Sequence, residues 1–210
     1  MVGNLISIAL QTDGKILVGS GTLFVPAASS GTLSRYNPNG STDTIFGIQG
    51  QVADLAGPVA IGVQSNGQIV SAGTIVSSLS LSGNGTGFGL TGYFSTGFPV
   101  FLFGTHGGEI TPFPGFVNSG ASSMAIQPNN FIVAAGQAAA NANSSVFALA
   151  RYIPNGLLDN TFGTGGLVTT NFGNGTAASI AAIALQSDGK IVAVGQASNS
   201  GFVVARYLGQ

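Results

Sequence analysis

Short apolar segments alternate with turn residues along the whole chain. Residues 6–11 alternate weakly between apolar and polar positions and end in Thr-Asp-Gly. Asp-Gly tolerates the positive φ angles of a two-residue type I′ turn, so we predict a β-hairpin whose second strand covers residues 15–20. No window combines helical periodicity with capping residues. The pattern therefore predicts an all-β protein.

Later second strands are rich in small residues. Residues 132–136 read Ile-Val-Ala-Ala-Gly and residues 191–195 read Ile-Val-Ala-Val-Gly. Such runs indicate strands buried on both faces, and the small residues predict close approach to a neighbour at the inner rim of a radial array. A third strand carries an Arg-Tyr pair, as in residues 147–152, and ends in a Pro-Asn-Gly turn.

These elements recur in four units. The phase is marked by Gln11, Gln64, Gln127 and Gln186, by Tyr36, Tyr93, Tyr152 and Tyr207, and by Phe-Gly at 46, 103 and 162. The spacings divide one domain, residues 1–210, into units of about 1–52, 53–110, 111–168 and 169–210. Repeated units of four short antiparallel strands are typical of propeller blades. We therefore predict a β-propeller of four-stranded antiparallel blades with about four repeats.

The motifs resemble the delta-60 repeat, a bacterial β-propeller-like family. Residues 184–191 read A-L-Q-S-D-G-K-I, residues 202–207 read F-V-V-A-R-Y, and residues 147–166 contain A-R-Y, P-N-G and L-D-N-T-F-G-T-G-G. The first unit matches at both ends and the second is degenerate. The resemblance implies a propeller fold and, frequently, membership of long bacterial surface or secreted proteins. It implies no chemistry and no catalytic residues.

Composition narrows the function classes. Charged residues are 5% of the chain, against about 25% in an ordinary soluble domain, whereas hydrophobic residues are 44% and supply a core. The net charge of −1 offers no electrostatic footprint for nucleic acid or anionic lipid. The chain has no cysteine, which excludes disulfides and thiol chemistry, and its one histidine excludes sites that need two.

No membrane insertion is expected. The longest strongly apolar stretch, residues 177–185, is far shorter than the ~20 residues of a spanning helix. Residues 1–20 lack the basic start, apolar stretch and cleavage site of a signal peptide.

Most of the few charges lie at repeated positions, so we interpret them as structural. The structural marks are Asp13, Lys15, Arg35, Asp43, Arg151, Asp159, Asp188, Lys190 and Arg206, with the tyrosines Tyr36, Tyr93, Tyr152 and Tyr207. We expect Asp13 to pair with Lys15 across its turn, and Asp188 with Lys190. We also expect each repeated tyrosine to be a packed ring with a satisfied hydroxyl.

The remaining repeated charges predict ion pairs. Arg35 stands eight residues before Asp43, as Arg151 does before Asp159. In the second unit Gly92 and Val100 replace both members together. Joint loss indicates an ion pair, because one partner alone leaves a buried charge that costs ~3–5 kcal/mol.

Three polar residues fall outside the repeat marks: Asp54, His106 and Glu109. They would serve a hydrolase or lyase only if they converged in one pocket; a solvated loop histidine is the expected alternative. The glycine-rich residues 83–89 lack the Lys-Ser/Thr ending of a phosphate loop, and one aspartate per turn is too sparse for calcium. We therefore predict no catalytic, cofactor or metal site.

The chain supplies fifteen predicted strands, which leaves one unit short by one strand. We expect a closed four-bladed ring in which strands from both termini complete a composite blade. The alternative is an excerpt of a longer array whose open edges pair with other copies.

The sequence favours a non-enzymatic structural or protein-interaction module of a bacterial surface or extracellular protein, whose partner is protein or further copies of itself. The first alternative is a carbohydrate-binding, lectin-like adhesin with a glycan partner. The remote alternative is a hydrolase or lyase that uses His106.

Overall fold

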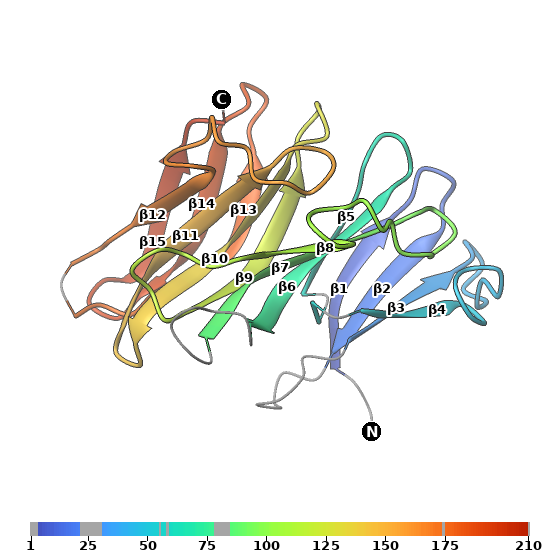
Figure 1. Cartoon of the computed structure of the whole chain (residues 1–210), viewed down its shortest axis with the longest axis horizontal. Coiled ribbons are helices and arrows are strands. Elements are labelled where there is room, and N and C mark those ends of the chain that lie inside the picture. The colour runs from blue at the N-terminus through green and yellow to red at the C-terminus, as the bar shows by residue number, and fades with distance from the viewer. Residues whose placement is uncertain are drawn as a thin grey trace.

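The computed structural model describes residues 4–21, 31–54, 56–57, 59–77, 85–173 and 175–209. Within these ranges the secondary structure is strand and turn, with no helix (Figure 1). This confirms the all-β prediction. It also leaves no described helix that could cross a bilayer.

The strands fall into four consecutive units. The first holds β1 (Asn4–Leu10), β2 (Ile16–Gly21), β3 (Gly31–Tyr36) and β4 (Gln51–Asp54). The second holds β5 (Ala60–Val63), β6 (Ile69–Ser77), β7 (Gly85–Tyr93) and β8 (Gly108–Thr111). The third holds β9 (Asn118–Ile126), β10 (Ile132–Asn141), β11 (Ser144–Tyr152) and β12 (Leu167–Thr170). The fourth holds β13 (Ala178–Leu185), β14 (Ile191–Ala197) and β15 (Gly201–Tyr207).

Strands that follow one another within a unit pair antiparallel. The first unit forms a four-stranded sheet and the described strands of the fourth form a three-stranded sheet. The second and third units share one eight-stranded sheet, because β7 and β9 meet in a parallel pair at Thr86 and Asn118. A set of four separate four-stranded blades is therefore not confirmed.

The first hairpin turn of each unit differs from the predicted type. Gln11 N–H donates to the Lys15 carbonyl at 2.8 Å, and Gly14 N–H donates to the Gln11 carbonyl at 2.9 Å. Gly14 has φ +81°, but Asp13 does not lie in the positive-φ region. This is a type I turn followed by a left-handed residue and a bulge, so the predicted type I′ turn is wrong. In the third unit Asn130, with φ +65°, takes the glycine's place.

Apolar cores fill the spaces between neighbouring units. Leu17, Leu33 and Phe46 of the first unit pack with Ile69 and Tyr93 of the second. Further cores join the second unit to the third through Leu90, Phe103, Ile132 and Tyr152, and the third to the fourth through Leu149, Phe162, Ile191 and Ala193. An inner sheet thus buries both of its faces against neighbours.

The small residues of the second strands allow close approach within a sheet. A Cβ added to Gly136 would lie 2.0 Å from the Gly120 carbonyl oxygen, and one added to Gly195 would lie 2.0 Å from that of Ser179. Both contacts occur where the pairing register shifts, on β9 and β13. Glycine is needed here because the bulged neighbouring strand turns a carbonyl toward it.

The units form an open array whose first and last sheets lie at opposite ends (Figure 1). Ile8 and Leu10 on β1 are each 72% exposed, and Phe202 and Val204 on β15 are 75% and 52% exposed. A ring closed within one chain would bury these two faces against each other. The expected closed ring with a composite blade is therefore wrong for this structure, because three successive junctions do not carry the array through a full turn.

Gly136→Ala should lower the free energy of unfolding by ~2 kcal/mol or more, because its methyl group must displace backbone in a packed sheet. Urea unfolding measures the change. Gly189→Ala is the control, because an added Cβ there meets nothing within 4 Å. Its loss of unfolding free energy should be only that of placing alanine in a left-handed conformation, about 1 kcal/mol. Equal losses in the two variants would contradict the clash.

Candidate functional site

The repeated arginines lie buried between neighbouring units. Arg35 Nε donates to Asp43 Oδ2 at 2.8 Å, and Arg151 Nε donates to Asp159 Oδ2 at 2.7 Å. Each guanidinium also stands over the phenylalanine of its own Phe-Gly pair, at 4.4 Å from the Phe46 ring centre in the first unit. A buried guanidinium is tolerated because an acid and an aromatic face compensate its desolvation.

Each of these arginines also reaches the next unit. Arg35 Nη1 donates to the carbonyl of Ser95, and Arg151 Nη1 donates to the carbonyl of Gly209 at 2.5 Å. Both carbonyls belong to the residue two positions after the repeated tyrosine. The arginine therefore joins its own aspartate to the backbone of the following unit.

The repeated glutamines supply a second link to the same carbonyl position. Gln64 Nε2 donates to the Pro154 carbonyl at 2.9 Å, and Gln127 Nε2 donates to the Gly209 carbonyl at 3.1 Å. In the first unit Gln11 instead accepts from Arg35 at 3.4 Å. The sequence shows these glutamines as phase markers, but it does not show what they bind.

In the second unit an aromatic ring fills the space of the missing ion pair. Val100 N–H donates to the Gly92 carbonyl at 2.9 Å, just as Asp43 N–H donates to the Arg35 carbonyl, so the two positions are equivalent. A Cβ on Gly92 would lie 2.5 Å from the Phe103 ring. Phe103 thus packs directly on the glycine backbone.

The turn charges do not pair as expected in the first unit. Lys15 Nζ donates to Asp43 Oδ2 at 2.7 Å, whereas Asp13 accepts the backbone N–H of Lys15 at 3.1 Å. The predicted Asp13–Lys15 side-chain pair is wrong, because the ammonium group turns toward the buried aspartate. In the fourth unit Lys190 does contact Asp188, at the surface.

The carboxyl or amide oxygen in this turn has a backbone role in every unit. Asn66 accepts from Gln68 N–H at 2.9 Å, and Asn129 accepts from Phe131 N–H at 3.2 Å. Because an amide oxygen accepts as a carboxylate does, aspartate and asparagine exchange here without loss of the turn.

The tyrosine hydroxyls join each unit to the end of the preceding one. Tyr93 donates to Asp54 at 2.9 Å, Tyr152 donates to Thr111 at 2.9 Å, and Tyr207 lies 2.8 Å from the Thr170 hydroxyl. Asp54, Thr111 and Thr170 are the last residues of β4, β8 and β12. Asp54 therefore occupies a repeated position, and the interpretation that it lies outside the repeat is wrong.

Asp54 is a buried carboxylate held by three donors. It is 1% exposed and accepts from the Ala56 N–H at 2.8 Å, from the Ser71 hydroxyl and from Tyr93. Burial raises the pKa of Asp54 and outweighs these hydrogen bonds. Asp43 differs, because hydrogen bonds from Lys15 and Arg35 hold its pKa below the ordinary value.

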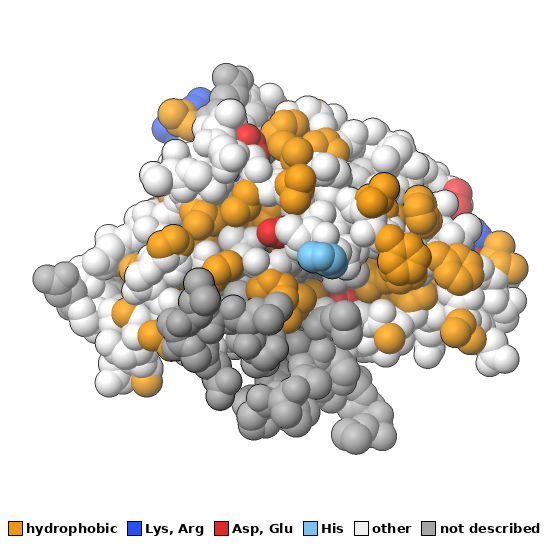
Figure 2. Space-filling view, in the orientation of Figure 1, with side chains coloured by type: hydrophobic (Ala, Val, Ile, Leu, Met, Phe, Trp, Pro, Cys, Tyr) orange, Lys and Arg blue, Asp and Glu red, His pale blue; other side chains and the backbone are white. Residues whose placement is uncertain are grey.

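His106 and Glu109 lie together in an open cleft of about 1040 Å³ on the second unit. The pale-blue histidine stands among hydrophobic side chains on the face shown in Figure 2. Residues 112–117, which lead from β8 to β9, form an apolar wall that includes Phe113 and Phe116. The cleft surface is mainly apolar, with His106, Glu109, Tyr93 and threonine side chains as its polar groups.

Asp54 does not line this cleft. Tyr93 lines it and donates to Asp54, which is buried and not among the lining residues. Burial raises the pKa of Glu109, against the hydrogen bonds from Thr105. The Glu109 Oε2 atom is buried and has no hydrogen-bond partner among the described residues. The structure therefore brings His106 and Glu109 together and leaves Asp54 out.

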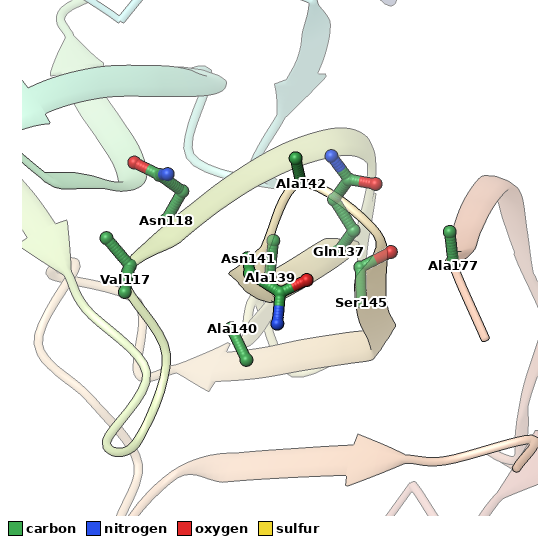
Figure 3. A pocket seen from close by; sticks show the side chains of 9 residues that line it. All are labelled: Val117, Asn118, Gln137, Ala139, Ala140, Asn141, Ala142, Ser145 and Ala177. Atoms are coloured by element: carbon green, nitrogen blue, oxygen red, sulfur yellow. The ribbon is translucent and has the colours of Figure 1, made fainter. Parts of the chain in front are cut away.

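A smaller hollow of about 410 Å³ lies beside the β10–β11 hairpin. Figure 3 shows Val117 and Asn118 on one side of it and Ala177 on the other. Its lining is uncharged, and its polar groups are Asn118, Gln137, Asn141 and Ser145. Among the residues that the structure describes, no group of three or more acidic or histidine side chains could hold a metal.

Three segments of the chain match the model of a family described as "Domain of unknown function (DUF5122) beta-propeller": residues 11–46, 127–162 and 186–209. Each segment begins at a repeated glutamine, so the match follows the same phase as the first, third and fourth units. The match supports a β-propeller repeat family, although not the delta-60 name in particular.

Two solved structures match the chain. A protein of unknown function from Dyadobacter fermentans DSM 18053 gives a TM-score of 0.53 at 13% identity, over 97% of this chain and 60% of that one. The polysaccharide lyase Uly1 gives a TM-score of 0.40 at 10% identity, over 95% of this chain and 48% of the lyase. No curated protein matches the chain. The chain thus spans three fifths or less of these two structures.

Arg151→Met should lower the free energy of unfolding by ~3–5 kcal/mol, because Asp159 then stays buried without its guanidinium. Arg151→Met combined with Asp159→Asn should recover part of this loss, since the amide oxygen still accepts from Thr161. A double-mutant cycle by urea unfolding measures the coupling. Additive losses would contradict the structural ion pair.

Asp54→Thr combined with Ser71→Ala should make the first junction resemble the second, where Thr111 faces Tyr152. The folded protein holds the Asp54 proton more tightly than the unfolded chain, because its pKa is raised. This group therefore favours folding at low pH and costs stability as pH rises through its folded pKa. Relative to wild type, the double variant should gain stability as pH rises above ~4, the ordinary pKa of an aspartate in the unfolded chain. The measurement is the free energy of unfolding in urea as a function of pH for both proteins. Parallel curves for wild type and the double variant would refute this.

Proposed function

We propose that the protein is a non-enzymatic, protein-interaction propeller module that binds an extended apolar segment of a partner protein in the cleft beside His106 and Glu109. A place on the bacterial surface or outside the cell is part of the proposal, and it rests on the resemblance to the delta-60 repeat. The observation that carries the proposal is the exposed apolar surface next to this cleft.

That surface lies in the loop between β7 and β8. Phe101 and Leu102 are 80% and 88% exposed, and Phe94 and Phe98 are also exposed in the same loop. Phe101 lines the cleft, so the loop continues the apolar wall of residues 112–117. Contiguous exposed apolar side chains mark interaction surfaces, whereas scattered ones do not.

Outside the cleft, the repeated polar side chains form hydrogen bonds in the junctions between units. Arg35, Arg151 and Asp54 are each hydrogen-bonded to side chains inside the array and offer no group to a substrate. In the cleft, Glu109 is the acidic residue of the lining. A basic residue on the bound segment would match its charge, while apolar side chains cover the phenylalanines.

The alternatives make different demands on the same cleft. A glycan needs several converging hydrogen-bond groups, and the lining here is mainly apolar. A hydrolase or lyase that uses His106, Glu109 and Asp54 needs all three in one pocket, and Asp54 is outside it. The protein-binding role fits the apolar wall and the exposed loop together.

Panning a phage-displayed peptide library on the purified protein tests the proposal. Enriched peptides should carry two or more large apolar residues and one Lys or Arg. They should lose binding to the Phe101→Ser/Leu102→Ser variant, whose changes lie on exposed side chains and should leave the unfolding temperature unchanged. Glu109→Gln should weaken the basic peptides selectively. No enrichment, or equal binding to the double variant, would overturn the proposal; hits on a glycan array would favour the lectin-like alternative.

A further inference from the structure

The three internal junctions use one set of contacts, and the two end faces carry the strand, glutamine, arginine and carbonyl parts of that set. In each junction the leading face presents a third strand, a repeated glutamine and, in two of the three cases, a repeated arginine. The receiving face presents a first strand and the carbonyl two residues after the repeated tyrosine. Among the described residues, nothing covers the leading face of the last unit on β15 or the receiving face of the first unit on β1.

The apolar halves match position by position. On the receiving faces, Ile61/Val63, Met124/Ile126 and Ile183/Leu185 pack against a junction core; the equivalent residues of the first unit are Ile8 and Leu10, which are exposed. On the leading faces, Leu33, Leu90 and Leu149 are fully buried. Their equivalent in the last unit is Val204, which is half exposed.

The polar halves match as well. Arg206 and Gln186 are exposed, whereas their equivalents Arg151 and Gln127 are buried and both donate to the Gly209 carbonyl. Within the described residues Arg206 makes no ion pair. The equivalent acceptor in the first unit is the carbonyl of Pro38, two residues after Tyr36.

We infer that the β15 face of one copy binds the β1 face of a second copy, in the arrangement of the internal junctions. Arg206 and Gln186 of the first copy donate to the Pro38 carbonyl of the second. Val204 and Val192 cover Ile8 and Leu10. The tyrosine link has no counterpart here, because no described strand follows β15 to face Tyr36. Asp159 and Phe162, which accompany Arg151, also have no described counterparts beside Arg206. The apolar contact and the two donors therefore hold this junction.

Such a contact is head-to-tail, because it joins two different surfaces. It leaves one β1 face and one β15 face uncovered in a pair, so copies add until the accumulated rotation closes a ring, or into a filament if it does not close. The contact is separate from the cleft of the second unit, and the two proposals stand or fall independently.

Sedimentation velocity over a concentration series tests the inference. Wild-type protein should associate as concentration rises. Val204→Asp and Ile8→Asp, both at exposed positions, should each be monomeric. An equimolar mixture of the two variants should form a one-to-one dimer that grows no further, because only one intact β15 face and one intact β1 face remain. A symmetric contact between like faces cannot give this result.

Arg206→Ala should weaken association about tenfold or more, the value of one hydrogen bond from a charged donor. Phe101→Ser/Leu102→Ser is the matched control: it should associate like wild type while losing the peptides selected on the cleft. Circular dichroism and the unfolding temperature check that every variant is folded. A wild-type protein that stays monomeric at its highest soluble concentration, or a mixture that stays monomeric, overturns the inference.

Discussion

Both faces of each unit in this protein are apolar, and at every internal junction a neighbouring unit covers them. This constraint explains why Arg35 and Arg151 can be buried at all: each lies where two units meet and finds an acid in one and a carbonyl in the other. It also explains why the conspicuous polar residues serve the fold. A side chain between two sheets has no solvent to satisfy it, so its partners must be built in.

The second unit shows that one space can be filled in two chemically different ways. With arginine, the guanidinium lies over the phenylalanine ring and links the units electrostatically. With Gly92, the ring of Phe103 moves onto the backbone and also contacts Gly156 of the following turn. The link to the carbonyl two residues after Tyr152 is then made by Gln64. Loss of the ion pair is thus accompanied by a compensating apolar contact.

Much of the fold could be predicted because its signals are local. The repeated turns, the strand lengths and the Arg–Asp spacing of eight residues all lie within one unit. The errors concern groups whose partners are distant. Lys15 turns to Asp43 because the buried carboxylate competes better than the exposed Asp13. The sequence does not show Asp54 as a repeated position, because threonine stands at the equivalent places. Both residue types accept a hydrogen bond from a tyrosine hydroxyl.

Neither the candidate site nor the openness of the array could be predicted from the sequence. The loop of Phe101 and Leu102 has no counterpart in the repeated motif, so its spacing carries no signal of an exposed surface beside His106. Whether the array closes depends on the rotation at each junction. That rotation is set by side-chain packing between units, which the pattern of a single unit does not specify.

The tyrosine and arginine links join fixed positions of adjacent units, and this makes the length of the chain modular. Removal of residues 55–111 would bring Tyr152 to Asp54 and the Pro154 carbonyl to Arg35, because Thr111 and Asp54 end equivalent strands. A deletion of half that length would leave buried donors facing apolar side chains. Arrays of this kind can therefore gain or lose material in whole units, and each added unit brings its own pair of compatible faces.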